Sequence, residues 1–96
     1  MLDSRRIKHS GLRRYAKRGD ARKINPKWVP KVNRILAALH AAVSPQDLDM
    51  PGFDFHELGV PRDGTFAVLV TRNWRITFRW DDAGPIDVNL EDYHGR

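Results

Sequence analysis

The hydrophobic periodicity of this chain changes once, near residue 46, and this change constrains the fold more than any other feature. Before it, apolar residues recur at three- and four-residue steps, as on one face of an α-helix. After it, they alternate with polar residues, as in strands with one buried face. Helices followed by strands predict an α+β domain, with two N-terminal helices packed on one face of a twisted, mainly antiparallel sheet of four to five strands. The 96 residues contain no repeat, so one domain is expected over residues 1–96.

The first part of the chain predicts a short strand and a short helix. The strand is expected near Ser4–Lys8. The helix is expected within residues 10–20, with Ser10 as its N-cap and Gly19 as its C-terminal stop.

A longer helix is expected within residues 24–47, where one apolar stripe recurs at helical spacing. The stripe consists of Trp28, Val32, Ile35, Leu36, Leu39 and Ala42. Pro30 lacks an N–H and crowds the preceding turn, so either the first turn is distorted or the regular helix starts at Pro30. Ser44–Pro45 is expected to end the helix.

Four later segments alternate between apolar and polar residues and predict strands. They are residues 53–58, 65–70, 73–80 and 86–93. The links between them are rich in Gly, Pro and Asp, which favour turns, so an antiparallel run is expected.

The alternation also assigns side chains to the two faces of the predicted sheet. One face should meet the helices and receives Trp74, Ile76, Phe78, Trp80, Ile86, Val88 and Leu90. The other face should be uncovered and receives Arg75, Thr77, Arg79, Asp87, Asn89 and Glu91. A sheet face that bears arginines, with histidines near its strand ends, suits the binding of phosphate groups.

Basic residues are concentrated in the first third of the chain. Residues 1–34 hold twelve Lys or Arg and two Asp, whereas residues 35–96 hold five Lys or Arg and ten Asp or Glu. This asymmetry favours a polyanionic partner, with nucleic acid first among them; a solvated basic face and an acidic protein partner are the alternatives. The side chains expected to contact RNA are Arg13, Arg14, Lys17, Arg22, Lys23, Arg62 and Arg79.

The composition excludes several classes of protein. The chain has no cysteine, which excludes disulfides and thiolate metal sites and suits a reducing compartment. No segment approaches the roughly 20 apolar residues of a membrane span, and the N-terminus lacks the apolar centre of a signal peptide. We therefore expect a cytoplasmic protein that does not contact the membrane.

The four histidines do not form a usual metal-binding pattern. They are His9, His40, His56 and His94, and no two lie three or four residues apart. The chain also lacks a P-loop, a GxGxxG motif and a GxSxG motif. Neither a metal nor a cofactor is expected.

The remaining chemistry is acid–base catalysis beside arginines, which suits cleavage of RNA through its own 2′-hydroxyl. His56, Tyr93 and His94 are candidates for proton transfer, and Arg75 is the candidate for binding the phosphate. Taken singly, a histidine or tyrosine is more often a packing or hydrogen-bonding residue. Asp92 is either catalytic or purely structural.

Four segments, in their order and spacing, resemble the HigB-type toxins, which are plasmid-maintenance killer proteins of the RelE/ParE superfamily. The segments are SGLRRYAKRGDARKINP, DLDMPGFDFHEL, NWRITFRW and VNLEDYH. The resemblance covers residues 7–94, and the combination of PGFDFHEL, NWRITF and a closing DYH is its most specific part.

The resemblance implies a RelE-like fold and cleavage of mRNA on the translating ribosome. It also implies a HigA-type helix-turn-helix antitoxin as partner, with operator DNA contacted only through the complex of toxin and antitoxin. In the family, the His of H-x-L, the Arg of NWR and the closing Asp-Tyr-His form the active site. The matching residues are His56, Arg75, Asp92, Tyr93 and His94.

The chain departs from the family pattern at several positions. It reads HELGVP where many relatives read HPLKGD, so Gly59 replaces a lysine often assigned to phosphate binding, and Arg62 could reach toward the same place. Leu69 stands where a polar or basic residue is common, and Gly95 and Arg96 follow the usual final histidine. A weak or conditional toxin is compatible with these departures.

Two other functions are compatible with the same superfamily. One is a ParE-like toxin that binds gyrase and cleaves nothing, and the other is a silent relative that acts as a co-repressor with its antitoxin. The closing Asp-Tyr-His favours the nuclease, because a protein that only binds needs no such set.

Overall fold

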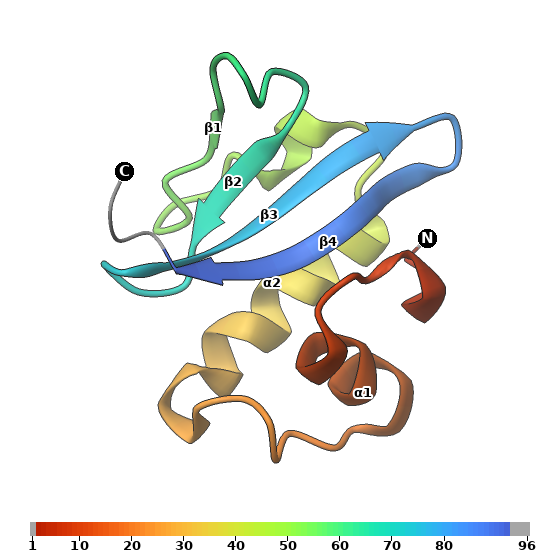
Figure 1. Ribbon diagram of the computed structural model, residues 1–96, viewed down its shortest axis with the longest axis vertical. Coiled ribbons are helices and arrows are strands. Elements are labelled where there is room, and N and C mark those ends of the chain that lie inside the picture. The colour runs from red at the N-terminus through yellow and green to blue at the C-terminus, as the bar shows by residue number, and fades with distance from the viewer. Residues whose placement is uncertain (1, 93–96) are drawn as a thin grey trace.

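Two helices cover one face of a four-stranded sheet in the computed structural model, which describes residues 2–92 (Figure 1). The helices are α1 (Ser10–Arg18) and α2 (Val29–Ala41). The strands are β1 (His56–Glu57), β2 (Phe66–Leu69), β3 (Trp74–Asp81) and β4 (Gly84–Asp92). They lie in the order β1-β2-β3-β4, and each is antiparallel to the next. The predicted α+β architecture is confirmed.

The strand predicted at Ser4–Lys8 is wrong. The Asp3 carboxylate accepts a hydrogen bond of 2.8 Å from the Arg5 N–H and begins a 3-10 helix over Ser4–Arg6. Only Ile7 then bridges to the sheet, in parallel with Val88 of β4. The basic N-terminal segment is thereby attached to the edge of the sheet formed by β4.

Helix α1 begins one residue earlier than predicted. His9, and not Ser10, is its N-cap, since the His9 Nδ1 accepts a hydrogen bond of 3.1 Å from the Leu12 N–H. Gly19 is the predicted C-terminal stop, with a φ of 71° that a residue with a side chain rarely adopts.

The distortion expected from Pro30 falls before helix α2. Residues Pro26–Trp28 form a 3-10 turn, and the regular helix begins at Val29. This places Pro30 in the first turn, where its missing N–H would have no helical partner in any case. The helix ends at Ala41, earlier than the sequence pattern suggested, and Pro45 begins a further 3-10 turn that ends at Leu48.

The hydrophobic core lies between the helices and the sheet. Its main side chains are Leu12 of α1, Val32, Ile35, Leu36 and Leu39 of α2, Ile76 and Phe78 of β3, and Val88 and Leu90 of β4. The rings of Trp28 and Trp74, with centroids 5.2 Å apart, pack against this core. The apolar stripe of α2 and the inward side of β3 are therefore confirmed.

A β-bulge changes the direction of one predicted core residue. Thr77 pairs with Asn89 but Arg79 pairs with Ile86, so β4 holds an extra residue opposite this part of β3. Asp87 adopts a φ of 55° there, a conformation that Asp tolerates better than most residues. Ile86 consequently shares the side of Arg79, and the prediction that it packs into the core is wrong.

The first predicted strand, residues 53–58, is much shorter in the structure. Only His56–Glu57 pair with β2, and Asp54 adopts a φ of 48°, which bends the chain before the strand. Phe53 remains fully buried in the core.

We predict that Leu39→Ala lowers the free energy of unfolding by about 2–5 kcal/mol, because it leaves a cavity at a fully buried position. Urea denaturation followed by circular dichroism measures the change. Val43→Ala is the control, because Val43 is 87% exposed and its truncation should change stability by less than about 0.5 kcal/mol. Equal losses in the two variants would contradict the assigned core.

Candidate functional site

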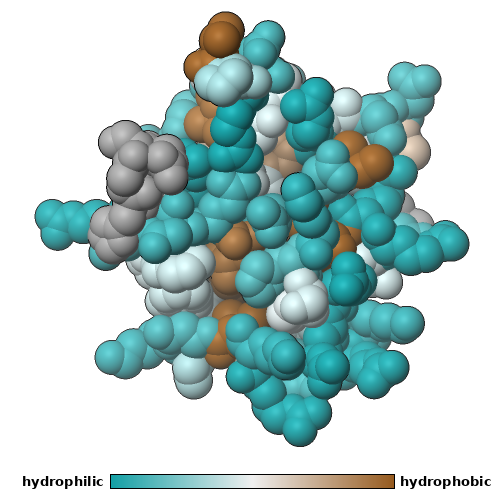
Figure 2. Space-filling model, viewed as in Figure 1, coloured by the Kyte–Doolittle hydropathy of each residue, from teal (hydrophilic) through white to brown (hydrophobic). Residues whose placement is uncertain are grey.

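The sheet face opposite the helices carries the polar side chains that the sequence placed there, but it is not uncovered. Arg75 is only 3% exposed and Thr77 only 1%, whereas Arg79 is exposed. Residues directly opposite on adjacent strands share a face, so Glu91 lies beside Arg75 and Asn89 beside Thr77. Figure 2, which looks onto the sheet side of the molecule, shows a largely hydrophilic surface there.

Part of the cover comes from the loop between β1 and β2. The Arg62 guanidinium of this loop donates two hydrogen bonds to the Glu91 carboxylate, each 2.7 Å long. Glu91 belongs to β4, which is separated from β2 by β3. The loop must therefore fold over the sheet for Arg62 to reach its partner.

Glu91 is the centre of this polar cluster. The Thr77 hydroxyl donates a hydrogen bond of 2.6 Å to one carboxylate oxygen, and the Arg75 Nη2 lies 3.6 Å from the other. The hydrogen bonds from Arg62 lower the pKa of Glu91 to about 2, aided by the Thr77 hydroxyl and the charge of Arg75, although burial opposes this shift. Two guanidinium groups and a hydroxyl thus converge on one ionised carboxylate, which we call the Glu91 cluster (Arg62, Arg75, Thr77 and Glu91).

His56 lies on the same face as the Glu91 cluster, at the other edge of the sheet. It pairs with Ala67, which pairs in turn with Thr77. Two interstrand spacings separate it from β3, roughly 10 Å. Its Nδ1 lies 3.0 Å from the Asp54 carbonyl oxygen, which can only accept a hydrogen bond. In the tautomer that matches this contact, Nδ1 carries the proton and Nε2 can accept one.

Of the remaining predicted catalytic residues, the structure describes only Asp92, the last residue of β4. Asp92 is exposed and pairs with Trp74, so strand alternation places it on the side of the sheet opposite Glu91. Tyr93 and His94 lie outside the residues that the structure describes. The structure thus brings Arg75 and His56 to one face.

The sequence alone did not single out Glu91 or Thr77 as functional residues. Alternation placed both on the face of Arg75, but only the register between β3 and β4 shows that Glu91 stands opposite Arg75. Gly59, which replaces the usual lysine, is exposed, and a Cβ built there would meet no atom within 4 Å. The last predicted residue of this face, Arg79, donates a hydrogen bond of 3.2 Å to the Thr65 hydroxyl.

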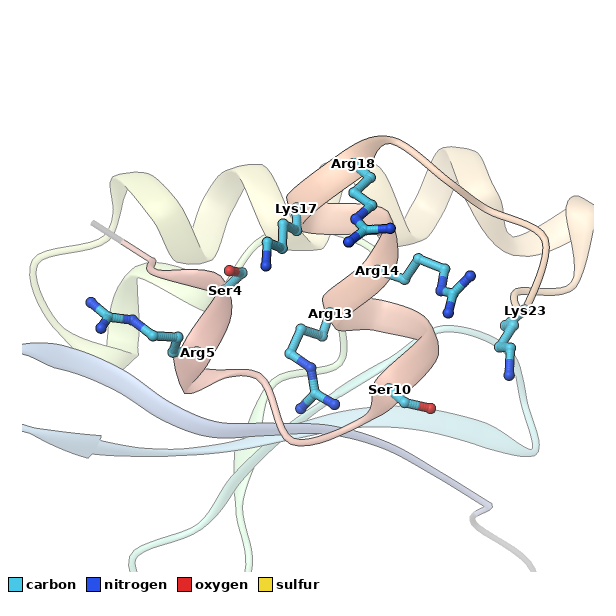
Figure 3. A pocket seen from close by; sticks show the side chains of 8 residues that line it. All are labelled: Ser4, Arg5, Ser10, Arg13, Arg14, Lys17, Arg18 and Lys23. Atoms are coloured by element: carbon cyan, nitrogen blue, oxygen red, sulfur yellow. The ribbon is translucent and has the colours of Figure 1, made fainter.

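A second basic surface lies on α1 and the segments beside it, around a shallow hollow of about 240 Å³ (Figure 3). Its cationic residues are Arg5, Arg13, Arg14, Lys17, Arg18 and Lys23, and we call them the basic ridge. Four of the predicted RNA-binding residues belong to it, whereas Arg22 does not line the hollow and pairs with Asp20 at 2.8 Å. Within residues 2–92, Lys17, Arg18 and Lys23 form no salt bridge.

The basic ridge and the Glu91 cluster are separate surfaces. They share no residue, since the ridge comes from the N-terminal segments and the cluster from the sheet and its β1–β2 loop. Arg62 and Arg79, which the sequence grouped with the RNA-binding residues, lie on the sheet face. Any polyanion that contacts both surfaces has to extend around the molecule.

The described part of the chain shows neither a metal-binding group nor a membrane-spanning helix. Among residues 2–92, no three His, Cys, Asp or Glu side chains gather as a metal ion would require. None of the helices in the same range is long and apolar enough to cross a membrane.

Comparison with known proteins identifies the family. The model of a family described as the RelE-like toxin of type II toxin-antitoxin system HigB matches residues 5–94. This chain belongs to the HigB-like toxin family. A curated relative, Endoribonuclease HigB of Proteus vulgaris, is 31% identical over 88 residues, which cover 92% of this chain and 96% of the relative. The predicted resemblance is confirmed, and membership of a type II toxin-antitoxin family implies an antitoxin as partner.

We predict that Glu91 makes the stability of the fold sensitive to acid. Its pKa of about 2 lies below the ordinary value of 4.5, so its contribution is present above about pH 4.5 and is lost as the pH falls toward 2. Urea denaturation at pH 7, 4.5 and 2.5 should show a smaller acid loss in Glu91→Gln than in the wild type. Asp63→Asn, which neutralises an exposed carboxylate of the neighbouring loop, should keep the wild-type dependence. Parallel curves for the wild type and Glu91→Gln would contradict this prediction.

Proposed function

We propose that this toxin is a ribosome-dependent endoribonuclease that cleaves mRNA by attack of the RNA's own 2′-hydroxyl. Family membership and the relative named as an endoribonuclease support RNA cleavage. The observation that carries the proposal is the pair of arginines at the Glu91 cluster, on the same sheet face as His56.

In this proposal the scissile phosphate binds at the Glu91 cluster, where Arg62 is the part-exposed guanidinium and Arg75 adds the positive charge of a buried one. A guanidinium fork matches two phosphate oxygens and stabilises the negative charge that develops on the phosphorane. Arg62 and Arg75 together carry two positive charges and Glu91 carries one negative charge, so the cluster keeps one positive charge. A phosphodiester, with one negative charge, neutralises that excess.

Proton transfer is assigned to His56 of this face and to residues that follow β4 in the sequence. One group removes the proton of the 2′-hydroxyl and a second protonates the leaving 5′-oxygen. His56 is one of these groups, because its Nε2 is available. His94 is the other, with Tyr93 as a group that orients the base or holds the phosphate and Asp92 as their support at the end of β4. This reaction needs no metal ion.

The basic ridge is proposed to bind ribosomal RNA while the sheet face meets the mRNA. Four of its cations form no salt bridge within residues 2–92, and they can replace counterions on phosphates: Arg13, Lys17, Arg18 and Lys23. With two basic surfaces, the toxin can bind ribosomal RNA through one and the mRNA held by the ribosome through the other.

The proposed partner is a HigA-type helix-turn-helix antitoxin, and operator DNA is contacted only through the complex that the two proteins form. The family supports an antitoxin in general. The proposed place of action, on translating ribosomes, makes the protein cytoplasmic.

We predict that His56→Ala and His94→Ala each abolish growth arrest when the toxin is induced, because each removes a proton-transfer group. Mapping of mRNA 5′ ends after induction should show codon-phased cuts with the wild type and none with either variant. His40→Ala is the matched control, since His40 is exposed on α2, where its Nδ1 accepts a hydrogen bond from the Leu2 N–H. Full arrest by both folded variants, or arrest with intact mRNA, would contradict the nuclease.

We predict that Lys17→Ala/Arg18→Ala weakens ribosome binding mainly through its salt dependence. The slope of log affinity against log salt concentration should fall by about 1–2, because each lost phosphate contact removes about 0.7–0.9. Sedimentation with ribosomes at several salt concentrations measures the slope. Arg34→Ala, which removes a cation stacked on Phe53 at a distance of 5.7 Å, should leave the slope unchanged. An unchanged slope in the double variant would exclude the ridge as a ribosome contact.

A further inference from the structure

Glu91 has no chemical step in the proposed reaction, yet its side chain has three polar partners on the sheet face. Its carboxylate accepts two hydrogen bonds from Arg62 and one from Thr77, and it lies 3.6 Å from Arg75. Its side chain is only 19% exposed. Its burial and its several polar partners indicate that this carboxylate has a role at the site.

The two arginines differ in how much they need Glu91. The Arg75 side chain is almost fully buried in β3 and is held by the sheet around it. The Arg62 side chain is 41% exposed and projects from a loop, so its long, flexible chain has many conformations available in water. The two hydrogen bonds of 2.7 Å form the planar fork-to-fork geometry that holds a guanidinium in one orientation.

The Glu91 carboxylate also allows the two positively charged guanidinium groups, of Arg62 and Arg75, to lie close to each other. Both Arg62 and Arg75 approach the same carboxylate oxygen, the former at 2.7 Å and the latter at 3.6 Å. Without a negative charge between them, two guanidinium groups at this separation repel each other, and the exposed one can move away into water. Glu91 therefore sets the position of Arg62 relative to Arg75.

We propose that Glu91 is a positioning residue that holds the part-exposed Arg62 beside the buried Arg75, so that the Arg62 guanidinium meets a phosphate of the RNA next to the positive charge of Arg75. The inference rests on the proposed RNA cleavage and adds Arg62 and Glu91 to the residues that serve it. Arg62 of the β1–β2 loop thereby supplies a cation over the sheet face.

Positioning and simple charge effects predict opposite results for Glu91→Gln. The substitution makes the protein more positive, so a carboxylate that merely repels RNA would give tighter binding and an undiminished cleavage rate when it is removed. A positioning carboxylate gives a lower rate at saturating toxin, because the catalytic contact made by Arg62 is lost in the transition state.

The test is single-turnover cleavage of mRNA on programmed ribosomes, with the toxin concentration varied so that the maximal rate and the half-saturating concentration are separated. We expect Glu91→Gln and Arg62→Ala each to lower the maximal rate by about 10- to 100-fold. The double variant Arg62→Ala/Glu91→Gln should have a maximal rate within about threefold of the slower single variant, because the two residues act as one unit. Asp63→Asn, which neutralises an exposed carboxylate of the same loop, should keep the wild-type rate.

Arg62→Ala keeps the inference testable if Glu91→Gln does not fold, because it leaves Glu91 as the counter-charge of the buried Arg75. A wild-type maximal rate in folded Arg62→Ala overturns the inference, as does tighter binding with a full rate in Glu91→Gln. Both results leave the proposed nuclease intact. Failure of the wild-type protein to cleave ribosome-bound mRNA overturns the proposed nuclease itself and is recognised in the same assay.

Discussion

A buried arginine needs a counter-charge, and the sheet of this protein is arranged around that requirement. Arg75 lies in the middle of the sheet face with almost no contact with water, and burial of an unpaired guanidinium costs several kcal/mol. The antiparallel register of β3 and β4 places Glu91 directly opposite it. The same carboxylate then attracts Arg62 and with it the loop between β1 and β2.

This arrangement separates the tasks of the two basic surfaces. At the Glu91 cluster, positive charge is enclosed, partly balanced and fixed by hydrogen bonds, which suits recognition of one phosphate in a defined position. On the basic ridge, the charges belong to long exposed side chains of α1 and its neighbours, which suits contact with many phosphates without selecting among them. The protein, with its net charge of +5, thus carries two basic surfaces with different physical properties.

The sequence pattern predicted the architecture well because α2 and β3 are strongly periodic. The stripe from Val32 to Leu39 matches the buried face of α2, and the predicted inward residues of β3 from Trp74 to Trp80 lie in the core or pack against it. The failures have local causes. A side-chain cap at Asp3 replaced the expected first strand with a 3-10 helix, and the bulge at Asp87 turned Ile86 away from the core.

The candidate site was less predictable than the fold. Alternation could place Arg75, Thr77 and Glu91 on one face, but it could not give the register that makes them partners. It also could not show that the loop folds back so that Arg62 covers this face, because that contact joins residues far apart in the sequence through side chains alone. The face predicted to be open is therefore largely buried at its centre.

We propose that the phosphate to be cleaved binds at the Glu91 cluster. The most direct measurement is a cryo-electron microscopy structure of the toxin on a ribosome whose mRNA carries a 2′-deoxy nucleotide at the cleavage site, so that the attack cannot occur. We expect the scissile phosphate to lie at the Glu91 cluster, within hydrogen-bonding distance of the Arg62 guanidinium and next to Arg75, with the basic ridge against ribosomal RNA. A scissile phosphate bound by the basic ridge, or by any surface that excludes Arg75, would contradict it.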